Sequence, residues 1–120
     1  CVGVCLMWLR SQGINYEYND RKGPVMAHWW QHDPRRFLDA FLSEGDPVRL
    51  SVVKKFDILM FLMAEDGGVF PSCAGVMVDE RHFLISTKER GSFVQMIDLF
   101  WKQRFWGAIR LRKVKEALTK

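Results

Sequence analysis

Two of the three cysteines lie at the start of the sequence, where one of them could act as a nucleophile. Cys1 and Cys5 belong to a predicted helix over residues 1–12. At a helix N-terminus, unpaired amides and the positive end of the helix dipole stabilise a thiolate and lower the pKa of a thiol. This effect favours Cys1, because Cys5 lies a full turn further in. The alternative is a packing role, since cysteine is among the most buried residue types.

A second catalytic group, acting beside the cysteine, would have to come from a predicted hairpin. Strands over residues 73–78 and 81–86 flank Asp79-Glu80, a pattern typical of a two-residue turn. The pairs predicted in this register are Met77 with His82 and Cys73 with Ser86. His82 then lies next to the turn, about 13 Å from the Cys73 end of the strand. We therefore expect His82 to be a surface residue that does not serve the same site.

Metal chemistry is weakly indicated. His28 and His32 have the i, i+4 spacing that can place two ligands on one helix face, but no third ligand accompanies them. A further hypothesis has Cys1 and Cys73 meeting across a cleft in a redox or metal role. Two sulfurs and a serine make a poor closed metal site. The sequence therefore predicts no metal and no cofactor.

The elements that would position these groups are helices first and strands afterwards. Helices are predicted over residues 1–12, ended by Gly13, and from Asp33-Pro34, a capping pair, to Gly45. Extended segments are predicted at 48–52, 58–64, 73–78, 81–86 and 105–114, with a further short segment at 93–99. This order indicates an α+β fold rather than repeated βαβ units. We expect one domain over 1–120, mainly helical over 1–45 and mainly antiparallel strands over 46–115.

Composition sets the broad class of the protein. The 120 residues are 48% hydrophobic and 27% charged, as in one globular domain that buries a core. No apolar run approaches the ~20 residues needed to cross a bilayer, and no signal-peptide pattern is visible. Three cysteines are too few, and odd in number, for a disulfide framework, so a reducing compartment is the simpler expectation.

The tryptophans and the basic residues near the C-terminus could together form a surface that binds nucleic acid. The five tryptophans are Trp8, Trp29, Trp30, Trp101 and Trp106, and the basic residues near the C-terminus are Lys102, Arg104, Arg110, Arg112, Lys113, Lys115 and Lys120. Together they could form a stacking surface. In the final predicted strand, however, Arg110 and Arg112 alternate with apolar residues, as in any half-buried edge strand. We therefore expect the tryptophans to pack in the core and at interfaces, and a nucleic-acid partner is disfavoured.

Four segments in order resemble motifs of the NlpC-type cysteine peptidases, the bacterial cell-wall branch of the papain-like fold. The segments are 1–14 at the nucleophile helix, 55–61 at the entry to the sheet, 71–86 at the histidine strand and its partner, and 104–111 at the closing strand. The resemblance implies N-terminal helices packed on a C-terminal antiparallel sheet. Phe56 replaces the glycine of the family's Pro-Gly-Asp run. The insert around Trp29-Trp30 is similar to versions found in tail proteins of long-tailed bacteriophages.

The resemblance also implies roles for three residues. Cys1 would be the nucleophile, Cys73 stands at the histidine position and Ser86, or the adjacent Thr87, at the third position. Moving one residue back from Cys73 gives Ser72, and neither residue has an ordinary pKa near neutrality to act as a base. We therefore expect a degenerate domain, a structural or binding component of a phage tail tip. It would be made in the bacterial cytoplasm and reside in the virion, beside other tail proteins and peptidoglycan.

The competing hypothesis is an active cysteine hydrolase. Such an enzyme would cleave peptidoglycan stem peptides by acylation of Cys1 during cell-wall penetration. It would need a different base, for example His28 or His32 folded back over the cleft.

Overall fold

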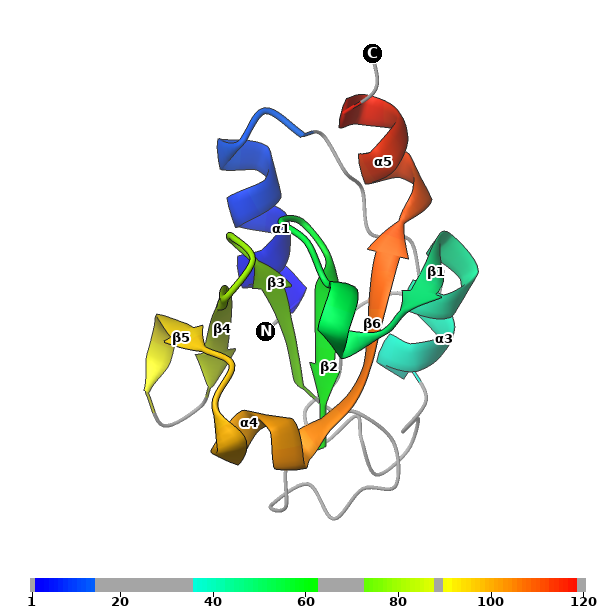
Figure 1. Cartoon of the computed structure of the whole chain (residues 1–120). Helices are drawn as coiled ribbons and strands as arrows, with labels where there is room; N and C mark the ends of the chain where they lie inside the picture. Colours follow the sequence, from blue (N-terminus) through cyan, green and yellow to red (C-terminus); the bar gives the residue numbers. More distant parts are fainter. Residues whose placement is uncertain (1, 15–35, 63–72, 88–89, 119–120) are drawn as a thin grey trace.

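The computed structural model describes residues 2–14, 36–62, 73–87 and 90–118. They form an antiparallel six-stranded sheet in the order β1-β6-β2-β3-β4-β5 (Figure 1). The strands are β1 Gly45–Val48, β2 Ile58–Phe61, β3 Cys73–Met77, β4 His82–Thr87, β5 Gly91–Met96 and β6 Phe105–Leu111. The helices are α1 Val2–Ser11, α3 Arg36–Glu44, α4 Leu99–Arg104 and α5 Arg112–Leu118, with a 3-10 turn η1 at Leu50–Val52. The predicted α+β class, with an N-terminal helix on an antiparallel sheet, is confirmed.

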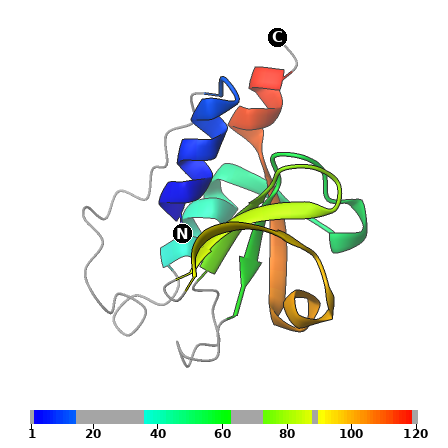
Figure 2. The ribbon, with the colours of Figure 1, turned by 90° about the vertical axis from the view of Figure 1, so that its left-hand side faces the viewer.

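The sheet separates two hydrophobic clusters. The first face, which we call the α1 face, is covered by α1, α3 and α5 through Leu9, Phe41 and Val114. The second face, which we call the α4 face, is covered by α4 through Trp101. Figure 2 shows α1 and α4 on opposite sides of the sheet. Because successive side chains in a strand point to opposite faces, β2, β3, β4 and β6 contribute to both clusters.

Aromatic packing concentrates on the α4 face. Trp101 is buried with its ring centroid 5.1 Å from that of Phe61 and 5.3 Å from that of Phe83, both in edge-to-face arrangements. Such pairs add to the burial of apolar area. On the other face Trp8 packs against Phe56 at 5.4 Å. The packing role predicted for tryptophan is confirmed for these two, whereas Trp106 remains 39% exposed.

Two glycines end helices as predicted, for different reasons. Gly13 has φ +83, and the N–H of Ile14 donates to the carbonyl of Leu9, which is the hydrogen bonding of a Schellman cap. Gly45 follows α3 directly and opens β1. A Cβ on Gly45 would lie 2.8 Å from the carbonyl oxygen of Arg110, so close strand packing requires glycine there. The capping pair Asp33-Pro34 lies outside the described residues.

Two predicted strands are partly wrong. Residues 50–52 form the 3-10 turn η1 instead of continuing a strand, and Val52 points into solvent, 55% exposed. Three alternating residues are too few for period alone to distinguish a strand from a turn. The last predicted strand ends at Leu111, and residues 112–118 form α5. That strand, β6, is also no edge, because it pairs with both β1 and β2.

Three further predictions are refined. The strand expected at 58–64 begins at Ile58 and ends at Phe61, and residues 63–64 lie outside the described part. The segment expected at 93–99 consists of β5 and the start of α4. Asp98 caps α4 by accepting a hydrogen bond from the N–H of Trp101 at 3.1 Å. Among the described residues, no helix combines the length and apolarity that crossing a bilayer requires.

Candidate functional site

The hairpin between β3 and β4 has a register one residue away from the predicted one. Met77 pairs with Phe83, whereas a two-residue turn would pair it with His82. The N–H of Val78 donates to the carbonyl of His82 at 3.0 Å and closes a turn of three residues, 79–81. The additional turn residue is Arg81.

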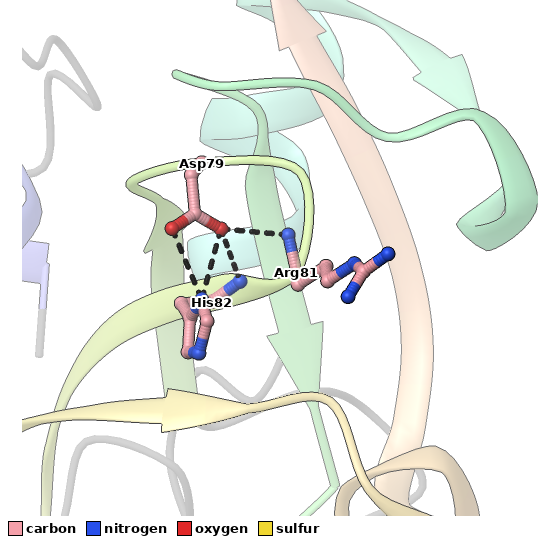
Figure 3. Close-up of polar contacts among 3 residues, drawn as sticks. All are labelled: Asp79, Arg81 and His82. Atoms are coloured by element: carbon pink, nitrogen blue, oxygen red, sulfur yellow. Dashed lines mark hydrogen bonds and ion pairs between the residues drawn. The ribbon is translucent and has the colours of Figure 1, made fainter.

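Asp79 explains this longer turn (Figure 3). Its Oδ1 accepts hydrogen bonds from the N–H groups of Arg81 at 2.7 Å and His82 at 2.8 Å. Asp side chains stabilise turns by binding backbone amides two or three residues ahead. These bonds, the one from the Arg81 amide first, lower the pKa of Asp79 below its ordinary value. The imidazole of His82 lies 3.0 Å from the same carboxylate, at the partly exposed end of the hairpin, as expected of a surface residue.

The register separates Cys73 from Ser86, whereas Thr87, the alternative third residue, ends β4 and its Oγ1 accepts a hydrogen bond from the N–H of Arg90 at 3.2 Å. Cys73 is buried on the α4 face, in the cluster that contains Phe83 and Ile85. Ser86 follows Ile85 in β4, so its side chain lies on the α1 face together with Leu84. The predicted pairing of Cys73 with Ser86 is therefore wrong. The Cys73 Sγ instead lies 4.0 Å from the backbone carbonyl oxygen of Ser86.

The β3 residues beneath α1 are apolar. Ala74 and Val76 of β3 are fully buried in the cluster that contains Cys5 and Leu9. The Cys5 Sγ points at the carbonyl oxygen of Ala74, 3.8 Å away. Burial raises the pKa of Cys5 to about 12, so this thiol stays protonated at neutral pH. Cys5 is therefore a packing residue, which agrees with the alternative considered for the N-terminal cysteines.

A buried ion pair joins two of the segments on which the family resemblance rests. The carboxylate of Asp57, directly before β2, accepts two hydrogen bonds from the guanidinium of Arg110 in β6, at 3.0 and 2.9 Å. It also accepts from the N–H of Lys54 at 2.8 Å. Asp57 is the one charged residue among the described residues that is buried. This pair was not predicted from the sequence, although an acidic residue directly before a wholly apolar strand is a local signal for it.

Phe56, directly before this aspartate, has φ +80. A positive φ is uncommon for an L-residue and favours glycine. The N–H of Phe56 donates to the carbonyl of Met77 at 2.8 Å, and the N–H of Met77 donates to the carbonyl of Asp57 at 2.8 Å. Backbone bonding to β3 therefore holds this conformation.

The basic residues near the C-terminus do not form one surface in the described part. Arg110 is paired with Asp57, Arg112 with Asp46 at 3.0 Å, and Lys113 with Glu44 at 3.7 Å. Lys102 and Arg104 lie on α4, away from α5. Because several of these cations have acidic partners, the structure adds no support for nucleic-acid binding.

A groove of about 590 Å³ lies beside the β3–β4 turn. Its lining is Leu50, Ser51, Val53, Glu80, Arg81, Met96, Ile97 and Lys102. Its position at η1, the turn and α4 places it away from α1 and from Cys5. Cys73, Ser86 and Thr87, the described residues of the predicted site, do not line this groove. The groove is thus separate from the predicted catalytic position.

The remaining predicted site residues cannot be placed. Cys1, His28, His32 and Ser72 lie outside the described residues. Within the described ranges, no group of three or more His, Cys, Asp or Glu side chains could hold a metal ion. Comparison with known proteins found no family model that matches this sequence and no curated protein with significant similarity to it.

Proposed function

We propose that this chain is a degenerate NlpC-type domain of papain-like fold that acts as a structural or binding component of a bacteriophage tail tip. The observation that carries the proposal is the chemistry of the surface beneath α1. The described β3 residues that face the helix are Ala74 and Val76, and Cys5 is a buried thiol of raised pKa. A cysteine hydrolase needs a base beside its nucleophile, and these side chains supply none.

Two features support the family resemblance behind this proposal. The backbone at Phe56 has the conformation that favours glycine, at the position where the family has one. Asp57 belongs to the motif over residues 55–61 and Arg110 to the motif over residues 104–111. Their side chains form an ion pair joined by two hydrogen bonds. A fold alone does not determine function, so the assignment to a tail tip rests on the resemblance.

Hydrolysis of peptidoglycan is the direct test. The purified full chain should release no stem peptides from cell-wall fragments under conditions in which an active cell-wall peptidase does so. The Cys1→Ala variant should behave identically to the parent protein. Peptide release that is lost in Cys1→Ala would overturn the proposal and establish the competing function, an active cysteine hydrolase.

Alkylation of the three cysteines provides a second test. Folded protein treated with a small alkylating reagent at pH 8 should react slowly at Cys5 and Cys73, because both are buried. For Cys5 the raised pKa further reduces the thiolate fraction. Mass spectrometry should show both sites reacting once the chain is unfolded in denaturant. A Cys1 rate that titrates well below the free-thiol value of about 8.5 would reveal an activated nucleophile and contradict the proposal.

A further inference from the structure

The outer edge of β5 carries unpaired backbone groups. The register pairs His82 with Met96 and Thr87 with Gly91, and the N–H of Ile97 donates to the carbonyl of Arg81 at 3.2 Å. In an antiparallel pair, hydrogen-bonded and non-hydrogen-bonded positions alternate. The residues whose backbone bonds point toward β4 are therefore 91, 93, 95 and 97. The backbone N–H and C=O groups of Ser92, Val94 and Met96 point away from the sheet.

No described element lies beyond this edge. β5 is the last strand of the sheet order, and Figure 1 shows it at the outer limit of the sheet. Val94 and Met96 are 57% and 51% exposed. The carbonyl of Met96 accepts a hydrogen bond from the side chain of the adjacent Gln95 at 3.0 Å, a contact that an incoming strand can replace. The strand contains no charged residue and no proline, the usual devices that block edge pairing.

We infer that β5 pairs with β5 of a second copy of this chain, in an antiparallel arrangement centred on Val94. The two-fold axis would place Val94 opposite Val94 of the second copy, and Ser92 opposite Met96 of the second copy. All three are outward-bonding positions, so each pair can exchange backbone hydrogen bonds. The two sheets would then form one continuous sheet, with a self-complementary interface of the kind that closed dimers use.

Charge complementarity favours a second copy as the occupant. In this register Arg90, in the turn directly before β5, lies at the same end of the paired strands as Asp98 of the second copy, which directly follows β5, and this holds at both ends. Arg90 and Asp98 are exposed. The guanidinium of Arg90 lies over the Phe93 ring, 4.0 Å from its centroid, beside the strand end. Asp98 keeps extended backbone angles, φ −103 and ψ −174, so it continues the strand direction. Opposite charges across paired strands stabilise a register, whereas like charges oppose it.

Sedimentation velocity on the full chain tests this inference. The parent protein should shift from one to two chain masses as its concentration rises through the micromolar range. Val94→Lys should weaken association at least about tenfold, because it places two ammonium groups opposite each other. Val94→Thr, which keeps a β-branched side chain without charge, should still dimerise. Leu99→Lys also adds a charge at an exposed apolar residue, but on α4, and it should dimerise as well.

Hydrogen exchange on the parent protein gives an independent readout that needs no variant. The amides of Ser92, Val94 and Met96 should become protected as concentration rises, whereas those of Phe93 and Gln95 should be protected at all concentrations. A single chain mass up to millimolar concentration would overturn the inference. So would a dimer that survives Val94→Lys, or one whose β5 edge amides exchange at the same rate as in the monomer.

Discussion

β1 and β5 both end the sheet, but their edges differ in composition and surroundings. β1 has four residues, includes Pro47, which has no N–H to offer, and carries Asp46, which pairs with Arg112 at 3.0 Å. α3 packs beside it, as Figure 1 shows. β5 has six uncharged residues, and two of its apolar side chains are exposed.

The difference indicates which edge is closed to other chains. A proline, a charge and a neighbouring helix are devices that prevent strand addition, and the β1 edge has all three. The β5 edge has none of them among its own residues. The β1 side is also where the buried pair of Asp57 and Arg110 and the close packing of Gly45 lie. We therefore expect the two sides to respond differently to substitution.

The largest expected effect is on the closed side, from Asp57→Ala. The carboxylate is 3% exposed and accepts two bonds from Arg110, whose side chain is 32% exposed. Removing the carboxylate leaves the Lys54 amide and the partly exposed Arg110 guanidinium without their acceptor, so we expect a loss of about 2 kcal/mol in the free energy of unfolding. Urea denaturation followed by circular dichroism measures this loss.

Asp46→Ala is the matched control for Asp57→Ala. It breaks the pair with Arg112 at the β1 edge, but both side chains are half exposed or more. Exposed pairs contribute about 0–1 kcal/mol, so this change should cost less than 1 kcal/mol. Equal losses in the two variants would show that the burial of Asp57 does not matter for stability and would remove one reason to expect a larger response to substitution on the β1 side.

The next effect concerns close strand packing, tested by Gly45→Ala. A Cβ at this position would lie 2.2 Å from the Ile109 side chain and 2.8 Å from the Arg110 carbonyl oxygen. Because the strand backbone would have to move, we expect a loss of about 1–3 kcal/mol in the free energy of unfolding. Thermal and urea unfolding of the variant would measure it.

Gly107→Ala on β6 is the corresponding control. A Cβ there would meet no atom within 4 Å, and the φ of Gly107 is not positive. Its effect should stay within about 0.5 kcal/mol, as for surface substitutions generally. If Gly45→Ala were equally neutral, the β1 edge would be looser than its contacts indicate.

The smallest expected effect is on the open side, at the β3–β4 turn. The pKa of Asp79 is lowered in the folded chain, chiefly by the amide of Arg81. The carboxylate therefore stabilises the folded state above its unfolded pKa of about 4, and this stabilisation is lost as the pH falls through the lower folded value. A carbon-detected NMR titration should show Asp79 protonating below 3.8, the ordinary value. A midpoint at or above 3.8 would contradict the turn geometry. Asp79→Ala should show a correspondingly weaker loss of stability between pH 5 and pH 2.

Several elements followed from the sequence because their signals are local. Gly13 after an amphipathic run predicted the end of α1, and the Schellman hydrogen bonds form there. The apolar run from Ile58 and the segments that flank Asp79-Glu80 predicted β2, β3 and β4, and these strands are present. Where the signal was brief, as at residues 50–52, the prediction was wrong. The candidate site was predictable as a set of residue types, but Cys1 and the other residues outside the described part stay predictions.

Burial and pairing could not be read from the sequence. Cys5 and Cys73 look alike as isolated thiols, yet they are buried on opposite faces of one sheet. Asp57 and Arg110 lie 53 residues apart, and their pairing depends on β2 and β6 being neighbours. The spacing of hydrophobic residues along the chain does not determine which strands become neighbours in the sheet.

The sequence by itself determined the α+β order, the ends of α1 and α3, and a hairpin at Asp79-Glu80. The tertiary structure decided the register of that hairpin, because the side chain of Asp79 binds two backbone amides and adds Arg81 to the turn. Side chains alternate between faces with a period of two, so a shift of one residue moves a whole strand's side chains to the other face. That single residue is why Ser86 lies on the α1 face and Cys73 on the α4 face.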